Sequence, residues 1–289
     1  MLNSTIINNF KSYLGSVLYY KNDTINNYVY EITIFLKYLQ DNNLAGRYES
    51  VLFSSYLKNR DLSHSKSIGT TNNIIKALKS FYNYLYNDGI ILNNISYNLE
   101  NNKPAYKIPD VLNCYQLYCI FECFNIDTET DIRNAAIIET LYSTGCRVTE
   151  LIEMKKVVYK DPNSSVIGKN DTERMVIFNN MAVKRIETYL QKRKIDSEYL
   201  FTNLKGKKLS RKYINAMIET VCTKAEIPFK VTAHTFRHTF ATHLLEGGAN
   251  IIQVKDLLGH KTVATTEIYS HFMRVEVLRK ELQSKHPRW

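Results

Sequence analysis

The stretch from Thr232 to His271 reads TAHTFRHTFATHLLEGGANIIQVKDLLGHKTVATTEIYSH, and it holds five of the seven histidines of the chain. Its apolar residues recur at helical intervals between 236 and 245, which predicts a helix with one buried side. The pair Gly247-Gly248 is typical of a helix end. A second helix with an apolar side is predicted over 251–258. Two short helices and the segment after them therefore organise the C-terminal half.

Four side chains of this stretch suit the binding of a phosphate. Arg237 follows His234 by three residues, so a helix places the two on one face. His260 comes directly after the second predicted helix, and Tyr269 follows nine residues later. Together they form a cationic site with a tyrosine within reach. The alternative for His260 is a simple helix cap, because a cation is favoured at a helix C-terminus.

Three short motifs occur in order here: His-Thr-Phe-Arg at 234–237, Leu-Gly-His at 258–260 and Thr-Glu-Ile-Tyr-Ser-His at 266–271. In this order and at this spacing they resemble the tyrosine recombinases, the phage-integrase and Xer-like group. The segment Thr-Gly-Cys-Arg-Val-Thr-Glu-Leu at 144–151 is similar to the family's Thr-Gly-x-Arg-x-x-Glu-Leu box. Each motif alone is weak, whereas their ordered combination is specific.

The resemblance implies a phosphoryl-transfer site. Arg147 and Arg237 are expected to clamp the non-bridging oxygens of the scissile phosphate, which suits the planar, permanently charged guanidinium. Tyr269 is the expected nucleophile, and a phenol with an ordinary pKa of about 10 needs neighbouring cations to ionise. His234 and His260 are expected to hydrogen-bond the phosphate and to move the tyrosine proton.

Two supporting residues flank these groups. Glu150 is expected to hold the Arg147 guanidinium, although a pair at this spacing is by itself an ordinary helix-surface contact. His271 lies close behind Tyr269. No acidic cluster is present to hold a metal, so we expect neither a metal nor a cofactor. A metal site on the helical histidines would have the right spacing, but no carboxylate or cysteine joins them at motif spacing.

Lys169 is the expected general acid for the departing 5′-oxygen. It lies in Gly-Lys-Asn-Asp-Thr-Glu-Arg at 168–174, at the tip of a predicted hairpin. The resembled family has Gly-Lys-Gly-x-Lys-x-Arg at this turn, so this chain lacks the second glycine and the second lysine. Lys160 is the weaker alternative, and a lysine at a turn tip is most often only solvated.

The N-terminal half is predicted to be helical, with apolar residues at helical intervals between 25 and 39 and again between 74 and 85. The simplest interpretation is a plain helical bundle. Lysines also punctuate its polar faces at positions suited to phosphate contacts, namely Lys66, Lys76, Lys79 and Lys103. In the resembled family this half grips the DNA face opposite the catalytic domain, which gives these lysines an expected DNA-binding role.

The fold class expected is mainly α with a small three-stranded antiparallel β-sheet in the C-terminal domain, arranged as a two-domain DNA clamp. The strands are predicted from the β-rich runs 157–159, 165–167 and 175–178. Prolines among polar residues predict a linker over 104–110, between an N-terminal helical domain at 1–103 and a catalytic domain at 111–289. The resemblance implies that the C-terminal helix, near 275–283, is exchanged between protomers.

Composition agrees with a nucleic-acid-binding protein. The net charge is +10 and the isoelectric point about 9.2, which favours a polyanionic partner, nucleic acid ahead of membrane. On charge alone, a generally basic surface with no partner is an equal alternative. The odd number of cysteines, five, favours reduced thiols. Neither a signal peptide nor a long apolar run is apparent, so we expect a cytoplasmic, nucleoid-associated protein with no membrane partner.

These observations predict a site-specific DNA recombinase that acts as a homotetramer on double-stranded DNA with a specific recombination site. Strands would be cut and rejoined through a 3′-phosphotyrosyl intermediate and a Holliday junction. One alternative is a nicking-closing enzyme like the type IB topoisomerases, which has similar chemistry without pairing of sites. Others are a catalytically silent sequence-specific DNA-binding protein and a metal-dependent hydrolase. The sequence leaves open whether the task is dimer or cointegrate resolution or the integration and excision of a mobile element.

Overall fold

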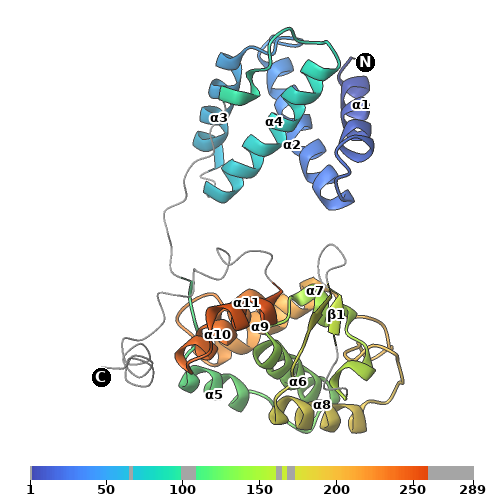
Figure 1. The fold of residues 1–289 in the computed structure, drawn as a ribbon, viewed down its shortest axis with the longest axis vertical. Coiled ribbons are helices and arrows are strands. Elements are labelled where there is room, and N and C mark those ends of the chain that lie inside the picture. The colour runs from blue at the N-terminus through green and yellow to red at the C-terminus, as the bar shows by residue number, and fades with distance from the viewer. Residues whose placement is uncertain (1, 65–67, 99–108, 161–164, 168–172, 260–289) are drawn as a thin grey trace, which may run out of the picture. The chain divides into compact units, whose positions relative to one another are not determined.

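The computed structural model describes residues 2–64, 68–98, 109–160, 165–167 and 173–259. The chain divides into two compact units, residues 1–106 and 107–289 (Figure 1). Each unit has its own hydrophobic core. Helices dominate both units. No helix within the described ranges has the length and apolar character needed to cross a membrane.

The N-terminal unit is built on two amphipathic helices, α2 and α4, which pack against each other and against α1. On α2 the buried residues include Ile32, Phe35 and Leu39, the spacing of one helical face. Phe10 of α1 meets Phe81 of α4 edge to face, with ring centroids 5.2 Å apart. The elements of this unit are α1 (Leu2–Ser16), α2 (Asn22–Asp41), α3 (Ser50–His64), α4 (Ile68–Asn87) and the 3₁₀ helix η1 (Ile95–Asn98).

Two of the lysines predicted to contact DNA are described here, both on α4. Lys76 is exposed and Lys79 is half-buried. Lys66 and Lys103 lie outside the described residues.

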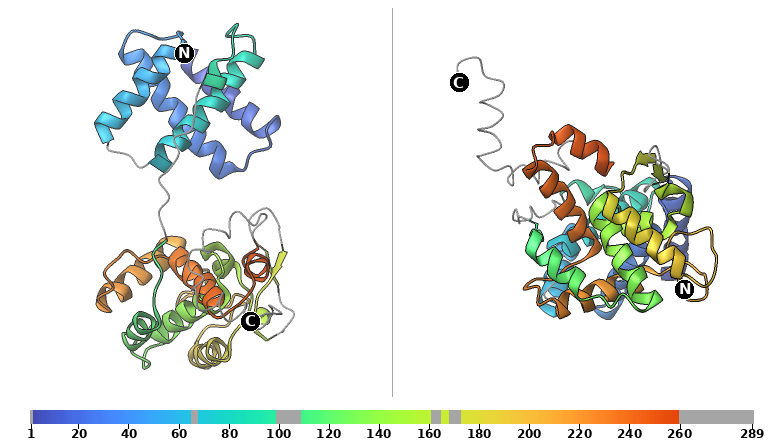
Figure 2. Two further views of the ribbon diagram at one scale, coloured as in Figure 1. Left: turned by 60° about the vertical axis from the view of Figure 1, so that its left-hand side comes forward. Right: turned by 90° about the horizontal axis from the view of Figure 1, so that it is seen from below.

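The catalytic-domain candidate is organised around helix α6. Every residue from 132 to 141 is buried, so this helix is covered on all sides, with α8 and α10 among the neighbours (Figure 2). The elements of this unit are α5 (Cys114–Glu122), α6 (Glu129–Thr144), α7 (Val148–Glu153), the 3₁₀ helix η2 (Lys156–Tyr159), β1 (Ser165–Ile167), β2 (Glu173–Met175), α8 (Asn180–Lys192), α9 (Arg211–Lys224), α10 (Ala233–Glu246) and α11 (Ile251–Leu258).

The sheet differs from the prediction of three strands. Among the described residues it has two antiparallel strands, β1 and β2, with Val166 opposite Arg174. The predicted strand at 157–159 is wrong, because this run forms η2, in which the Val158 N–H donates to the Lys155 carbonyl. Bridge pairing falls one turn earlier, between Lys155 and Tyr199. The hydrogen bonds of this local turn outweigh the strand propensity of the short Val-Val-Tyr run.

Gly145 lies where helices α6, α10 and α11 meet. It ends α6 with φ 56° and ψ 25°, the left-handed conformation that favours glycine. A Cβ atom at this position would lie 2.5 Å from Cδ1 of Phe240 and 3.1 Å from Cδ2 of Leu258. The close approach of these helices therefore requires glycine.

Gly145→Ala is expected to lower the free energy of unfolding by about 2–4 kcal/mol, from backbone strain plus overpacking. Gly248→Ala is the matched control, because Gly248 also has a positive φ, 93°, but open space around its Cβ position. The control should lose about 1–2 kcal/mol from backbone strain alone. Urea unfolding followed by circular dichroism measures both, and equal losses would contradict the packing argument.

Candidate active site

Helix α10 supplies two of the predicted catalytic residues. It starts with a capping box in which the side chains of Thr232 and Thr235 each accept from the other's backbone N–H. This start leaves His234 in the first turn, partly buried but still open to solvent, and puts Arg237 one turn further along. Arg237 points inward and is 1% exposed.

Arg237 joins the C-terminal ends of two helices. Its Nη1 donates to the Gly145 carbonyl at 2.7 Å, just after α6, and its Nη2 donates to the Leu258 carbonyl, the last residue of α11. Carbonyls at helix C-termini lack partners within the helix and carry partial negative charge, so a guanidinium satisfies and stabilises them.

Arg147 and Glu150 form the predicted pair at the start of α7. Glu150 accepts from the Arg147 backbone N–H at 3.0 Å and from Nη1 of the same residue at 2.8 Å. The Glu150 side chain is 1% exposed whereas that of Arg147 is 31% exposed. The buried carboxylate therefore orients a guanidinium that still reaches solvent, and the helix-surface alternative for this pair is wrong.

Arg174 of β2 also binds this carboxylate, and sequence reasoning assigned it no role. Its Nε and Nη2 donate to Oε2 of Glu150 at 3.1 and 2.7 Å. Its Nη1 donates to the Leu257 carbonyl at 2.5 Å. The available signal was its position as the last residue of the 168–174 segment, which ends in arginine like the family's turn.

The cluster carries an excess of positive charge. Two guanidinium groups, those of Arg147 and Arg174, bind the one carboxylate of Glu150. A third, that of Arg237, lies close enough to act with Arg174 and Glu150 on the pKa of Cys146. Burial acts to raise the pKa of Glu150, but the charge and hydrogen bonds of Arg174, then those of Arg147, outweigh it and hold the pKa below its ordinary value. Glu150 is therefore ionised at neutral pH, and the cluster keeps a net charge that suits an anion.

His234 belongs to the same site. Partial burial lowers its pKa, and the charges of Arg237 and Arg147 lower it further. The ring of His238, one turn on, lies edge to face with that of His234 at a centroid distance of 4.8 Å. The structure thus brings together His234, Arg237 and Arg147, with His234 neutral at neutral pH and able to accept a proton.

The remaining predicted residues fall outside the described ranges. Lys169 lies between the described strands β1 and β2, and His260 follows directly after Gly259, the left-handed C-cap of α11. Tyr269 and His271 belong to the segment after α11. Within the ranges that the structure describes, no three His, Cys, Asp or Glu side chains are grouped to hold a metal ion.

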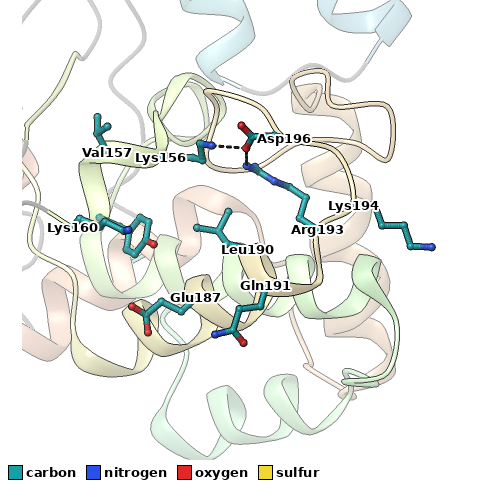
Figure 3. Close-up of a pocket in the computed structure, with 10 residues that line it drawn as sticks. Lys156, Val157, Lys160, Glu187, Leu190, Gln191, Arg193, Lys194 and Asp196 are labelled. Atoms are coloured by element: carbon teal, nitrogen blue, oxygen red, sulfur yellow. Dashed lines mark hydrogen bonds and ion pairs between the residues drawn. The ribbon is translucent and has the colours of Figure 1, made fainter.

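A hollow of about 740 Å³ elsewhere in this unit shares no residue with the arginine cluster (Figure 3). It lies between η2 and the end of α8. Two of its four cations, Lys156 and Arg193, share the carboxylate of Asp196 at 2.5 and 3.2 Å. The hollow is therefore not part of the phosphate site that the arginines form.

Comparison with known proteins shows the family of the chain. The sequence profile described as "Phage integrase family" matches residues 115–274, and the one described as "Phage integrase, N-terminal SAM-like domain" matches residues 7–89. Tyrosine recombinase XerD of Staphylococcus aureus is 35% identical over 222 residues, which cover 74% of this chain and 75% of that protein. The chain belongs to the phage integrase family, the tyrosine recombinases.

Solved structures of other proteins share the fold of this family member. XerH site-specific recombinase, in a post-cleavage complex with palindromic difH substrate, is 22% identical with a TM-score of 0.74, covering 91% of this chain and 80% of that chain. A lambda integrase tetramer bound to a Holliday junction is 20% identical with a TM-score of 0.74, covering 94% and 77%.

Glu150→Gln is expected to lower the free energy of unfolding by about 3–5 kcal/mol, because it leaves the buried Arg174 without its counter-charge. Glu153→Gln on the same helix is the matched control, since Glu153 is 59% exposed in its ion pair with Lys208. The control should change stability by less than about 1 kcal/mol. Urea unfolding of both variants tests this, and a small loss for Glu150→Gln would refute the role given to the carboxylate.

The pKa of His238 is lowered to about 4 by burial first, then by the charges of His234 and Arg237. The folded state therefore binds fewer protons than the unfolded state below the ordinary histidine pKa of about 6.5, so stability should fall as the pH drops from 6.5 towards 4. A pH titration of the His238 ring, followed by nuclear magnetic resonance, should give a midpoint at about pH 4. His234→Gln should raise this midpoint, and an ordinary midpoint in the wild type would contradict the burial argument.

Proposed function

We propose that this protein is a site-specific DNA recombinase that cleaves and rejoins DNA strands through Tyr269. The observation that carries the proposal is the cluster of Arg147, Arg237 and neutral His234, in which a buried carboxylate holds Arg147 and two helix-end carbonyls hold Arg237. Such a cluster stabilises the charge that develops on the non-bridging oxygens of a phosphate in its transition state. Membership of the tyrosine recombinase family supports the same chemistry.

In the proposed reaction the Tyr269 oxygen attacks the scissile phosphorus. A bond forms between that oxygen and phosphorus as the bond to the 5′-oxygen breaks, which leaves a 3′-phosphotyrosyl link and a 5′-hydroxyl. His234 and His260 accept and stabilise the tyrosine proton, and Lys169 gives a proton to the departing oxygen. Attack by a 5′-hydroxyl on the phosphotyrosyl link reverses these steps and rejoins a strand.

The proposed assembly is a homotetramer on two duplexes that passes through a Holliday junction, with the C-terminal helix exchanged between protomers. The two units, joined by a linker over 104–110, would close around the DNA as a clamp, and the division of the chain after residue 106 supports this linker. The proposed phosphate contacts of the N-terminal unit are Lys66, Lys76, Lys79 and Lys103. The net charge of +10 and the DNA-bound structures of XerH and lambda integrase support this picture.

Covalent trapping on nicked DNA substrates, with EDTA present, tests the nucleophile. The wild type should give a covalent protein–DNA adduct, and Tyr269→Phe should give none because it lacks the attacking oxygen. Tyr118→Phe is the matched control, since Tyr118 is 60% exposed on α5 and has no proposed role. Substrates would be drawn from DNA flanking the gene, in whole and half sites.

The same assay separates the proposed roles and the rival functions. Lys169→Ala should slow trapping by about 100- to 10,000-fold on ordinary DNA and should trap normally when sulfur replaces the 5′-bridging oxygen, because that leaving group needs no acid. Tight DNA binding without any adduct would favour the silent DNA-binding protein. Relaxation of supercoiled DNA by monomers at no specific site would favour the topoisomerase-like enzyme, and an adduct lost in EDTA would reject the metal-independent mechanism.

A further inference from the structure

Arg174 contacts two parts of the candidate site at once. Its Nε and Nη2 bind the Glu150 carboxylate, and its Nη1 binds the Leu257 carbonyl at the end of α11. The side chain is 4% exposed. Its Nε, Nη1 and Nη2 all donate to protein groups, so any effect of Arg174 on a DNA phosphate would come through the residues that it holds.

Each of these contacts leads to a residue proposed to act on the phosphate. Glu150 binds Arg147, so Arg174 and Arg147 grip one carboxylate from two sides. Leu257 lies three residues before His260. Arg174 itself lies on β2, five residues after Lys169.

Arg174 also works in parallel with Arg237. Arg237 donates hydrogen bonds to the Gly145 and Leu258 carbonyls. Arg174 donates to the Leu257 carbonyl and, at 3.5 Å, to the Thr144 carbonyl, each of which directly precedes a carbonyl bound by Arg237. Two guanidinium groups therefore hold successive carbonyls at the ends of the same two helices, α6 and α11. These paired contacts fix the end of α11 relative to the end of α6, and the Glu150 contact of Arg174 ties both to α7.

We propose that Arg174 is a positioning residue, which sets Arg147 and the end of α11 in one geometry for the scissile phosphate. The expected effect of Arg174 on the rate of DNA cleavage rests on the proposed function. Only arginine can fill the role, because its planar fork binds a carboxylate with two N–H groups while a third reaches a carbonyl. A lysine keeps the charge but concentrates its donors at one point.

A substitution at Gly259 is a second way to perturb the Arg174 side chain. A Cβ atom at this position would lie 2.8 Å from Cδ of Arg174, and the φ of 62° is a left-handed conformation. Glycine thus leaves room for the Arg174 side chain to pass. Gly259→Ala displaces that side chain without changing any charge.

The test compares Arg174→Lys with Arg185→Lys. Arg185 pairs with the buried Glu139 between α8 and α6, so its variant makes the same change beside a buried carboxylate away from the site. Arg174→Lys should slow covalent trapping by about 10- to 100-fold, because small misplacements of catalytic groups cost this much. Its affinity for DNA should stay within about threefold of wild type, and the control should match wild type in both measurements.

A double-mutant comparison with Arg147→Lys distinguishes a positioning role of Arg174 from a general loss of structure. Adding Arg174→Lys to Arg147→Lys should slow trapping by no more than about threefold further, because both variants disturb one unit. Gly259→Ala should reproduce the slow trapping at unchanged DNA affinity, and it stands in if Arg174→Lys does not fold. Full additivity, or trapping at the wild-type rate in both variants, would overturn the inference.

An activity-free readout keeps the inference distinct from the proposed function. The Nη–H resonances of Arg147, whose Nη1 donates to Glu150, should be resolved and protected from exchange in the wild type, and averaged or fast-exchanging in Arg174→Lys. If the wild type forms no adduct on any DNA, the proposed function fails while this measurement still decides the positioning role. An unchanged Arg147 resonance in Arg174→Lys would overturn the inference on its own.

Discussion

The buried carboxylate of Glu150 is the group on which the rest of the site depends. Taking an ion out of water costs several kcal/mol unless good partners replace the water. Here Glu150 accepts from Arg147 through both backbone and side chain, and from two nitrogens of Arg174. The same contacts solve a second problem, because guanidinium groups packed close together repel one another. One carboxylate and the carbonyls at two helix ends offset that repulsion, yet they leave the net positive charge that a phosphate needs.

Protein groups alone make the contacts that hold this arrangement. Arg237 is already bound to the ends of α6 and α11, and Arg147 is already bound to Glu150. Catalysis of phosphoryl transfer consists mostly of positioning and electrostatic stabilisation. Charges fixed in advance by buried contacts need no reorganisation when the transition state forms, which is why they lower the barrier more than mobile charges in water do.

Sequence periodicity and short motifs predicted the helices and part of the site. They succeed for contacts between residues close in sequence and fail for contacts between residues far apart in sequence. The Arg147–Glu150 contact spans three residues at a helix start, so its spacing alone indicated it. Arg174 lies 24 residues from Glu150 and 83 from Leu257, and no local pattern reports such distances. The strand expected at 157–159 failed for the opposite reason, since the hydrogen bonds of the local turn after Met154 decide the conformation of this run. That Arg147, His234 and Arg237 form one site was predicted only through the resemblance. Helix packing brings these residues together, and no local sequence pattern reports that packing.

The histidine shows how the cluster links binding to proton transfer. His234 has a lowered pKa, first from burial and then from the charges of Arg237 and Arg147. A phosphate bound by those two guanidinium groups adds negative charge close to the ring and offsets their effect. The proton affinity of His234 therefore rises when the substrate occupies the site. A base that is neutral in the free protein, and more basic once the phosphate is bound, is poised to take the tyrosine proton at the step where the phenol attacks. In the free protein the same cations keep His234 neutral, so it adds no positive charge to a cluster that already holds three.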